Sequence, residues 1–181
     1  FVVPDTKLDV RVIRLPLKDE PKSPLTCWNK GVEAALGDII VLSCIEIVHE
    51  TAILEELTKD LSENEYRLAA AWCPEEDKYH THSTVSVPTC PAGTGIGFTA
   101  ALTKKTYQRV GGFDEAYREG AGYEDRDFIH RLYNAGVKFV HRDDLVVTHP
   151  KSGATINWGA EKFKRNEDLY YSKWPEADKS V

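Results

Sequence analysis

The feature that most constrains the fold is an unbroken apolar run of one strand's length, Ile39-Ile40-Val41-Leu42. A strand that is apolar at every position is typical of one buried on both faces of a parallel sheet. Just before it, apolar residues recur at helical spacing and a glycine stands where that helix would end: Leu25, Trp28, Val32, Ala35 and Gly37. This order of helix, turn and buried strand predicts an α/β fold.

The rest of the chain continues the alternation of helices and strands. Helical patterns predict helices over 51–61, 101–110 and 124–134, and short apolar runs predict strands over 67–72, 137–140 and 145–148. The polar stretch 74–91 is interpreted as a long loop with weak strands. We therefore expect a single layered α/β domain over residues 1–181, with a mainly parallel sheet flanked by helices.

Charge and composition exclude several classes of protein. The formal net charge of −6 argues against a broad surface for nucleic acid or an anionic membrane. No apolar run approaches the roughly 20 residues of a membrane-spanning helix and no secretion signal is recognisable, so a cytoplasmic protein without a transmembrane segment is expected. The four cysteines form no CxxC pair, which disfavours a zinc knot and predicts reduced thiols.

An adjacent acid pair, Glu124-Asp125, stands at the start of the helix predicted over 124–134. The N-terminus of a helix stabilises negative charge, so an ionised carboxylate there can accept a proton. The alternative is that acids are simply preferred in the first helical turn.

Two further side chains stand at predicted strand ends, where ligands collect in open α/β sheets. Glu46 follows the apolar run and His149 follows the strand over 145–148. A carboxylate, an imidazole and phosphate oxygens together suit Mg²⁺ or Mn²⁺. The alternatives are a solvated acid and a hydrogen-bonded histidine. A His-x-His pair, His80 and His82, has a spacing that suits a metal on a strand, but it lies in the predicted loop, where exposure to solvent is the plainer interpretation.

The glycine-rich stretch 93–97 lacks the ending of a P-loop and the spacing of a dinucleotide-binding turn. It is either a flexible turn or a place where the backbone comes close to a ligand.

Together these segments resemble the family-two glycosyltransferases, which have the GT-A nucleotide-sugar fold. The resemblance covers residues 29–149. Its first block is Asn29-Lys30-Gly31 followed by Gly37-Asp38 and the apolar strand. Its second and more specific block is Gly111-Gly112-Phe113-Asp114-Glu115, then Glu124-Asp125-Arg126-Asp127-Phe128, Arg131-Leu132 and Ala135-Gly136.

The resemblance implies a hexosyltransferase of carbohydrate biosynthesis that moves a sugar from a nucleotide-diphosphate sugar, with a UDP-sugar favoured, to a hydroxyl of a glycan or another acceptor. Asp125 corresponds to the catalytic base, with Glu124 orienting it or the acceptor. Glu46 and His149 correspond to the metal site, for Mn²⁺ or Mg²⁺. Base and metal on opposite sides suit one inverting displacement.

The remaining roles concern substrate contacts. The resemblance implies donor contacts from Asn29, Cys44, Gly95 and Gly97, and Trp158 is a candidate acceptor contact, with core packing as its alternative. Residues 1–50 then form a donor-side remnant, 90–150 the acceptor and catalytic part, and 151–181 a C-terminal helix and tail.

Two departures from the family pattern are evident. Cys44-Ile45-Glu46 stands where the family has Asp-x-Asp, so the first acid is absent. The family's first nucleotide-binding strand has no counterpart before Phe1, and no methionine occurs, which predicts a chain whose start has been removed. The alternatives are therefore a degenerate nucleotide-sugar or carbohydrate binding domain, or a homo-oligomer whose partner subunit covers the open sheet edge.

Overall fold

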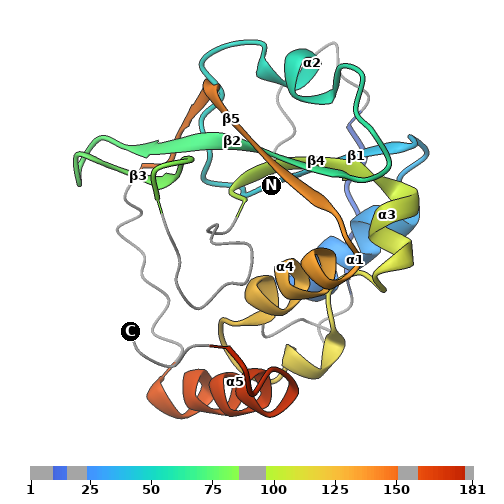
Figure 1. Ribbon diagram of the computed structural model, residues 1–181, viewed down its shortest axis with the longest axis vertical. Coiled ribbons are helices and arrows are strands. Elements are labelled where there is room, and N and C mark those ends of the chain that lie inside the picture. The colour runs from blue at the N-terminus through green and yellow to red at the C-terminus, as the bar shows by residue number, and fades with distance from the viewer. Residues whose placement is uncertain (1–9, 16–23, 86–96, 151–158, 178–181) are drawn as a thin grey trace.

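The computed structural model describes residues 10–15, 24–85, 97–150 and 159–177 (Figure 1). Helices and strands alternate up to β2: α1 (Leu25–Ala34), β1 (Ile39–Ser43), α2 (Ile53–Thr58) and β2 (Glu65–Cys73). Two more strands, β3 (Lys78–Thr81) and β4 (Thr99–Thr103), and then α3 (Lys104–Arg109) come next. A 3₁₀ turn (Glu115–Tyr117), α4 (Glu124–Asn134), β5 (Lys138–Thr148) and α5 (Ala160–Lys173) follow. The predicted α/β class with helices flanking a central sheet is confirmed.

The sheet has the strand order β1-β4-β2-β3, and β5 also pairs with β2. The pairing of β2 with β5 is parallel, whereas β1 with β4, β4 with β2 and β2 with β3 are antiparallel. Within the described strands the prediction of a mainly parallel sheet is therefore wrong. Its basis was the alternation of helices and strands together with the apolar run of β1, but in that run Ile39 is 40% exposed and only Ile40 and Leu42 are buried. An apolar run thus marks here a strand near the sheet edge, not one covered on both faces.

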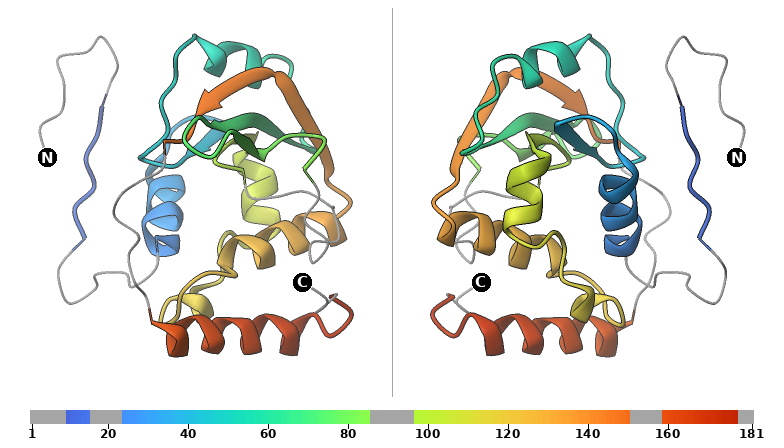
Figure 2. Two further views of the ribbon diagram at one scale, coloured as in Figure 1. Left: turned by 90° about the vertical axis from the view of Figure 1, so that its left-hand side faces the viewer. Right: turned by 90° about the vertical axis from the view of Figure 1, so that its right-hand side faces the viewer.

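Alternate side chains along the strands build two separate cores, one on each face of the sheet. Tyr66, Leu68 and Leu102 point into the larger core, which α1, α3, α4 and α5 complete. Ala69, Ala71 and Val147 belong to the smaller core on the other face, under α2. Figures 1 and 2 show this layering, with α2 on one side of the sheet and α4 on the other. The period of two in a strand explains why neighbouring residues serve different cores.

One predicted helix and two predicted strands differ from the structure. The helix expected over 101–110 is β4 up to Thr103 and only then α3, because residues 99–103 are buried between β1 and β2 and the ladder overrides the helical preference of alanine. Thr103 then caps α3, its hydroxyl accepting from the amide of Thr106. The strands expected over 137–140 and 145–148 are one strand, β5, whose register on β2 shifts between Ala69 and Ala70.

Helix α5 lies beyond α4, on the far side from the sheet (Figure 2). The buried carboxylate of Asp127 in α4 accepts hydrogen bonds from four side chains: Arg131 Nε at 2.8 Å, Lys173 Nζ at 2.7 Å, Trp174 Nε1 at 3.0 Å and the Tyr117 hydroxyl at 3.3 Å. Asn166 of α5, also fully buried, donates to the carbonyls of Tyr117 and Gly122. These polar contacts fix α5 against α4 and the loop that precedes it.

Candidate active site

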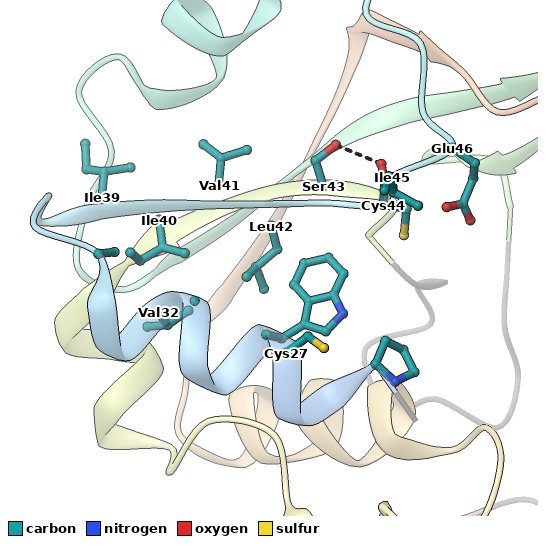
Figure 3. Close-up of a pocket in the computed structure, with 14 residues that line it drawn as sticks. Cys27, Val32, Ile39, Ile40, Val41, Leu42, Ser43, Cys44, Ile45 and Glu46 are labelled. Atoms are coloured by element: carbon teal, nitrogen blue, oxygen red, sulfur yellow. Dashed lines mark hydrogen bonds between the residues drawn. The ribbon is translucent and has the colours of Figure 1, made fainter. Parts of the chain in front are cut away.

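The carboxyl end of β1 opens into a cavity of about 620 Å³ that runs along β1 and α1 (Figure 3). Ile40 and Leu42 point toward the helix, while Cys44 and Glu46 stand at the end of the strand. The amide of Cys44 donates to the carbonyl of Phe98 at 2.9 Å, and the amide of Ile47 donates to the carbonyl of Cys44 at 3.2 Å. The chain therefore turns directly after β1 and holds Glu46 at the mouth of the cavity.

The thiol of Cys44 lies between the acid at the strand end and the acid at the start of α4. Burial, followed by the negative charges of Glu46 and Asp125, raises the pKa of Cys44 to about 12. Because the charges of Glu46 and Asp125 both act on the thiol of Cys44, the predicted metal ligand and the predicted base lie on either side of the same residue. At neutral pH the thiol keeps its proton, so it is a poor ligand for a hard cation such as Mg²⁺.

Glu124 and Asp125 begin α4 and line a second cavity of about 110 Å³. Trp28 and Cys44 border both cavities, so the two are neighbours. The amide of Arg126 donates to Oδ1 of Asp125 at 2.6 Å. Burial raises the pKa of Asp125, although this hydrogen bond and the charge of Arg126 oppose the rise. A carboxylate with a raised pKa in a cavity is suited to accept a proton near neutral pH.

Glu46 and His149 lie together, as the sequence predicted. Oε1 of Glu46 is 3.5 Å from Nε2 of His149, and the two side chains are 38% and 16% exposed. The amide of His149 donates to the carbonyl of Trp72 at 2.7 Å, which fixes the residue just beyond β5. No described residue forms a hydrogen bond with the buried Nδ1 of His149. The pair thus offers one carboxylate and one imidazole at the same sheet edge.

Gly97 lines the second cavity with Cys44 and Asp125. A Cβ added at Gly97 would lie 2.7 Å from both the Cβ of Ala100 and the hydroxyl of Tyr66. The backbone therefore approaches the sheet at a distance that only glycine permits. Gly95 and Trp158 lie outside the described residues.

Asn29 has a different position from the other predicted donor contacts, and borders neither cavity. Its Nδ2 donates to the carbonyl of Phe113 at 2.9 Å and to Oε1 of Glu115 at 2.7 Å, and its Oδ1 accepts from the Tyr107 hydroxyl at 2.6 Å and from the amide of Phe113 at 3.0 Å. The amide is thereby fully engaged in joining α1 to the Gly111-Gly112-Phe113 turn. Its observed contacts are structural.

Sequence reasoning missed the aromatic surroundings of His149. The ring centroid of Phe98 lies 4.5 Å from that of His149, and the ring of His80 lies 5.1 Å from it. Burial, the nearby His149 and Lys78 lower the pKa of His80, so its imidazole is neutral. His82 faces Asp143 instead, with Nε2 3.6 Å from Oδ2. The His-x-His pattern was the only signal available, and the structure separates its two members.

Comparisons with known proteins address the fold. The solved structures include a mannosyltransferase, PcManGT from Pyrobaculum calidifontis, in complex with GDP-Man and Mn²⁺, which is similar to this chain with a TM-score of 0.52 and 14% identity. That match covers 87% of this chain and 45% of the mannosyltransferase. The chain has a GT-A glycosyltransferase fold.

Residues 78–151 match a family model described as the N-terminal domain of galactosyltransferase. GalNAc-T7 with UDP, GalNAc and Mn²⁺ is also similar, at 11% identity and a TM-score of 0.49, over 88% of this chain and 39% of GalNAc-T7. This chain therefore spans less than half of either structure, and its similarity to a glycosyltransferase family model is confined to residues 78–151. No curated protein matches it. Among the described residues, no helix is long and apolar enough to cross a membrane.

Proposed function

We propose that this chain catalyses transfer of a sugar from a nucleotide-diphosphate sugar to an acceptor hydroxyl, with inversion, using Asp125 as the general base. The observation that carries the proposal is the common cavity wall. Asp125 at the start of α4 and Cys44 beside Glu46 at the end of β1 face the same space. The matched segment 78–151 contains Asp125 and His149 but not Glu46. The GT-A fold and the Mn²⁺ and GDP-Man held by PcManGT add support.

In the proposed reaction the acceptor oxygen forms a bond to the anomeric carbon while the bond from that carbon to the diphosphate oxygen breaks. The proton of the acceptor hydroxyl passes to the carboxylate of Asp125, and the nucleoside diphosphate leaves with the bonding electrons. A sugar hydroxyl is a weak nucleophile, so a positioned base contributes about 10²–10⁴-fold to such a step. Burial of Asp125 raises its pKa and improves it as a proton acceptor.

Residues that follow β1 and β5 fit a divalent cation. Glu46 supplies a hard oxygen and His149 a nitrogen, 3.5 Å apart, and the buried Nδ1 of His149 has no hydrogen-bond partner among the described residues. When bound, Mn²⁺ or Mg²⁺ would neutralise charge on the leaving diphosphate. Two protein donors with the remaining positions left to phosphate oxygens and water is a common arrangement for such cations.

A second candidate function is binding of a nucleotide sugar without transfer. The protonated thiol of Cys44, at the position of the first acid in the resembling family, favours this alternative because it removes one hard ligand. Calorimetry separates the two functions. Donor binding without release of nucleotide, at every Mn²⁺ concentration, would support the binding domain.

The test of transfer is a donor panel scored by released nucleotide, with Mn²⁺ present and with wild type compared to Asp125→Asn. The matched control is Asp168→Asn, because Asp168 lies on the outer face of α5 with its side chain 65% exposed. We expect Asp125→Asn to lose about 10²–10⁴-fold in turnover, and the control to keep wild-type turnover. Equal turnover in all three proteins would remove Asp125 from the mechanism.

A further inference from the structure

The hairpin of β2 and β3 carries a cluster of metal-binding side chains outside the proposed Glu46–His149 site. Cys73 ends β2, Glu76 lies in the turn, and His80 stands on β3. One ligand atom from each of the three lies within 4.8 Å of the other two. Cys73 is 1% exposed, whereas the side chains of Glu76 and His80 are each 26% exposed. One side of the cluster is thus closed by protein and the other is open to an incoming ion.

A bulge in the hairpin affects the position of His80 relative to Cys73. Ala71 pairs with Thr81 but Trp72 pairs with Tyr79, so His80 is the extra residue of β3. Bulges of this kind redirect a side chain and are frequent beside functional sites. Trp72 and Tyr79 pack together on one face, with ring centroids 4.9 Å apart. Cys73 follows Trp72 in β2 and His80 follows Tyr79 in β3, so both lie on the opposite face of the hairpin from that aromatic pair.

From this geometry we propose that Cys73, Glu76 and His80 bind a Zn²⁺-class cation, separate from the hard cation expected at Glu46 and His149. Thiolate, imidazole and carboxylate form the donor set that Zn²⁺ prefers. Nε2 of His80 is already 3.5 Å from Oε2 of Glu76, close to the separation of two ligands around one tetrahedral ion. Three protein ligands leave a fourth position for water.

Two neighbouring groups bear on the strength of the site. The thiol of Cys73 donates a hydrogen bond to Oε2 of Glu75 at 3.6 Å, a contact that a bound metal would have to replace. The ammonium group of Lys78 lies 2.8 Å from Oε2 of Glu76, with its side chain 57% exposed. A fixed positive charge opposes a cation at short range. Replacing Lys78 by alanine should therefore tighten cation binding, whereas a purely structural hairpin would bind no cation in either form.

The site would also bear on the candidate active site. The amide of His149 is bonded to the carbonyl of Trp72, and the ring of His80 lies 5.1 Å from that of His149. A cation that clamps the ends of the hairpin would hold this wall of the active site in place.

The test uses Co²⁺ as a probe on the full chain, because thiolate ligation to Co²⁺ gives a sulfur-to-metal charge-transfer band. We expect the band to saturate with Co²⁺ and to be lost when Zn²⁺ displaces the bound Co²⁺. The band should be absent in Cys73→Ser and should persist in Cys27→Ser, Cys44→Ser and Cys90→Ser. Retention of the band in folded Cys73→Ser, or absence of any saturable band in wild type, overturns the proposal.

A second pair of variants keeps the test independent of the buried cysteine. His80→Asn and Glu76→Gln alter partly exposed side chains and should weaken Zn²⁺ binding by more than about 100-fold, beyond the usual effect of an outer contact. His82→Asn is the matched control, since His82 faces Asp143. Wild-type Zn²⁺ affinity in folded His80→Asn and Glu76→Gln would contradict the site. Because the proposed Glu46–His149 pair is unchanged in all of these variants, either proposal can fail without the other.

Discussion

Replacement of Asp127 by asparagine should destabilise the fold strongly, even though Asp127 stands only two residues from the proposed base. Its carboxylate is fully buried and accepts from four donors, two of them the cations of Arg131 and Lys173. Asparagine keeps the shape but removes the charge and turns an amide donor toward other donors. Breaking a buried ion pair costs about 3–5 kcal/mol. Because the cationic side chains are 19% and 29% exposed, we expect the lower end of that range.

A loss of about 3 kcal/mol should lower the midpoint of thermal unfolding by roughly 6–12 °C for a chain of this size. Circular dichroism of wild type and Asp127→Asn, at the same pH and protein concentration, measures the shift. Asp168→Asn is the control, because the pair of Asp168 with Lys164 is exposed and its loss should leave the unfolding midpoint close to that of wild type. Unfolding of Asp127→Asn at the wild-type midpoint would refute the claim that this carboxylate fixes α5 to α4.

Two further predictions concern the cavity. Burial raises the pKa of Asp125, so the folded state binds the proton of this carboxyl more tightly than the unfolded state does. The contribution of this carboxyl to the free energy of unfolding is therefore fully present in acid and is lost as the pH rises through the folded-state pKa. Asp125→Asn should therefore unfold at a higher temperature than wild type at neutral pH, with the difference shrinking in acid, and a lower midpoint at neutral pH would contradict this sign. Cys44→Asp should reduce the Mn²⁺ concentration needed for half-maximal binding, measured by calorimetry, because a carboxylate replaces a protonated thiol; an unchanged Mn²⁺ titration would place Cys44 away from the cation.

Local signals in the sequence predicted the site-bearing elements well. The helix over 124–134 is α4 (Glu124–Asn134), because a first turn rich in acids and Ala135-Gly136 after its end mark its bounds. The strand that ends shortly before Glu46 was also predicted, and Glu46 and His149, which follow β1 and β5, lie together. These predictions depend on periodicity and capping, which the chain carries residue by residue.

Pairing between distant segments was not predictable in the same way. Nothing local in residues 99–103 indicates that they join β1 to β2, so a helix was expected where β4 lies. The hydrogen bonds of Asn29 to Phe113 and Glu115 span more than eighty positions, and no spacing rule reveals them. The bulge that redirects His80 depends likewise on how β3 meets β2.

The central claim is that the carboxylate of Asp125 receives the acceptor proton in the cavity it shares with Cys44. The most direct measurement is the pH dependence of kcat/KM for transfer, in wild type and in Asp125→Asn. Wild-type kcat/KM should rise with pH through a pKa above the ordinary range of an aspartate, and this rising limb should be absent in the far slower variant. The same rising limb in both proteins, at similar rates, would contradict the claim.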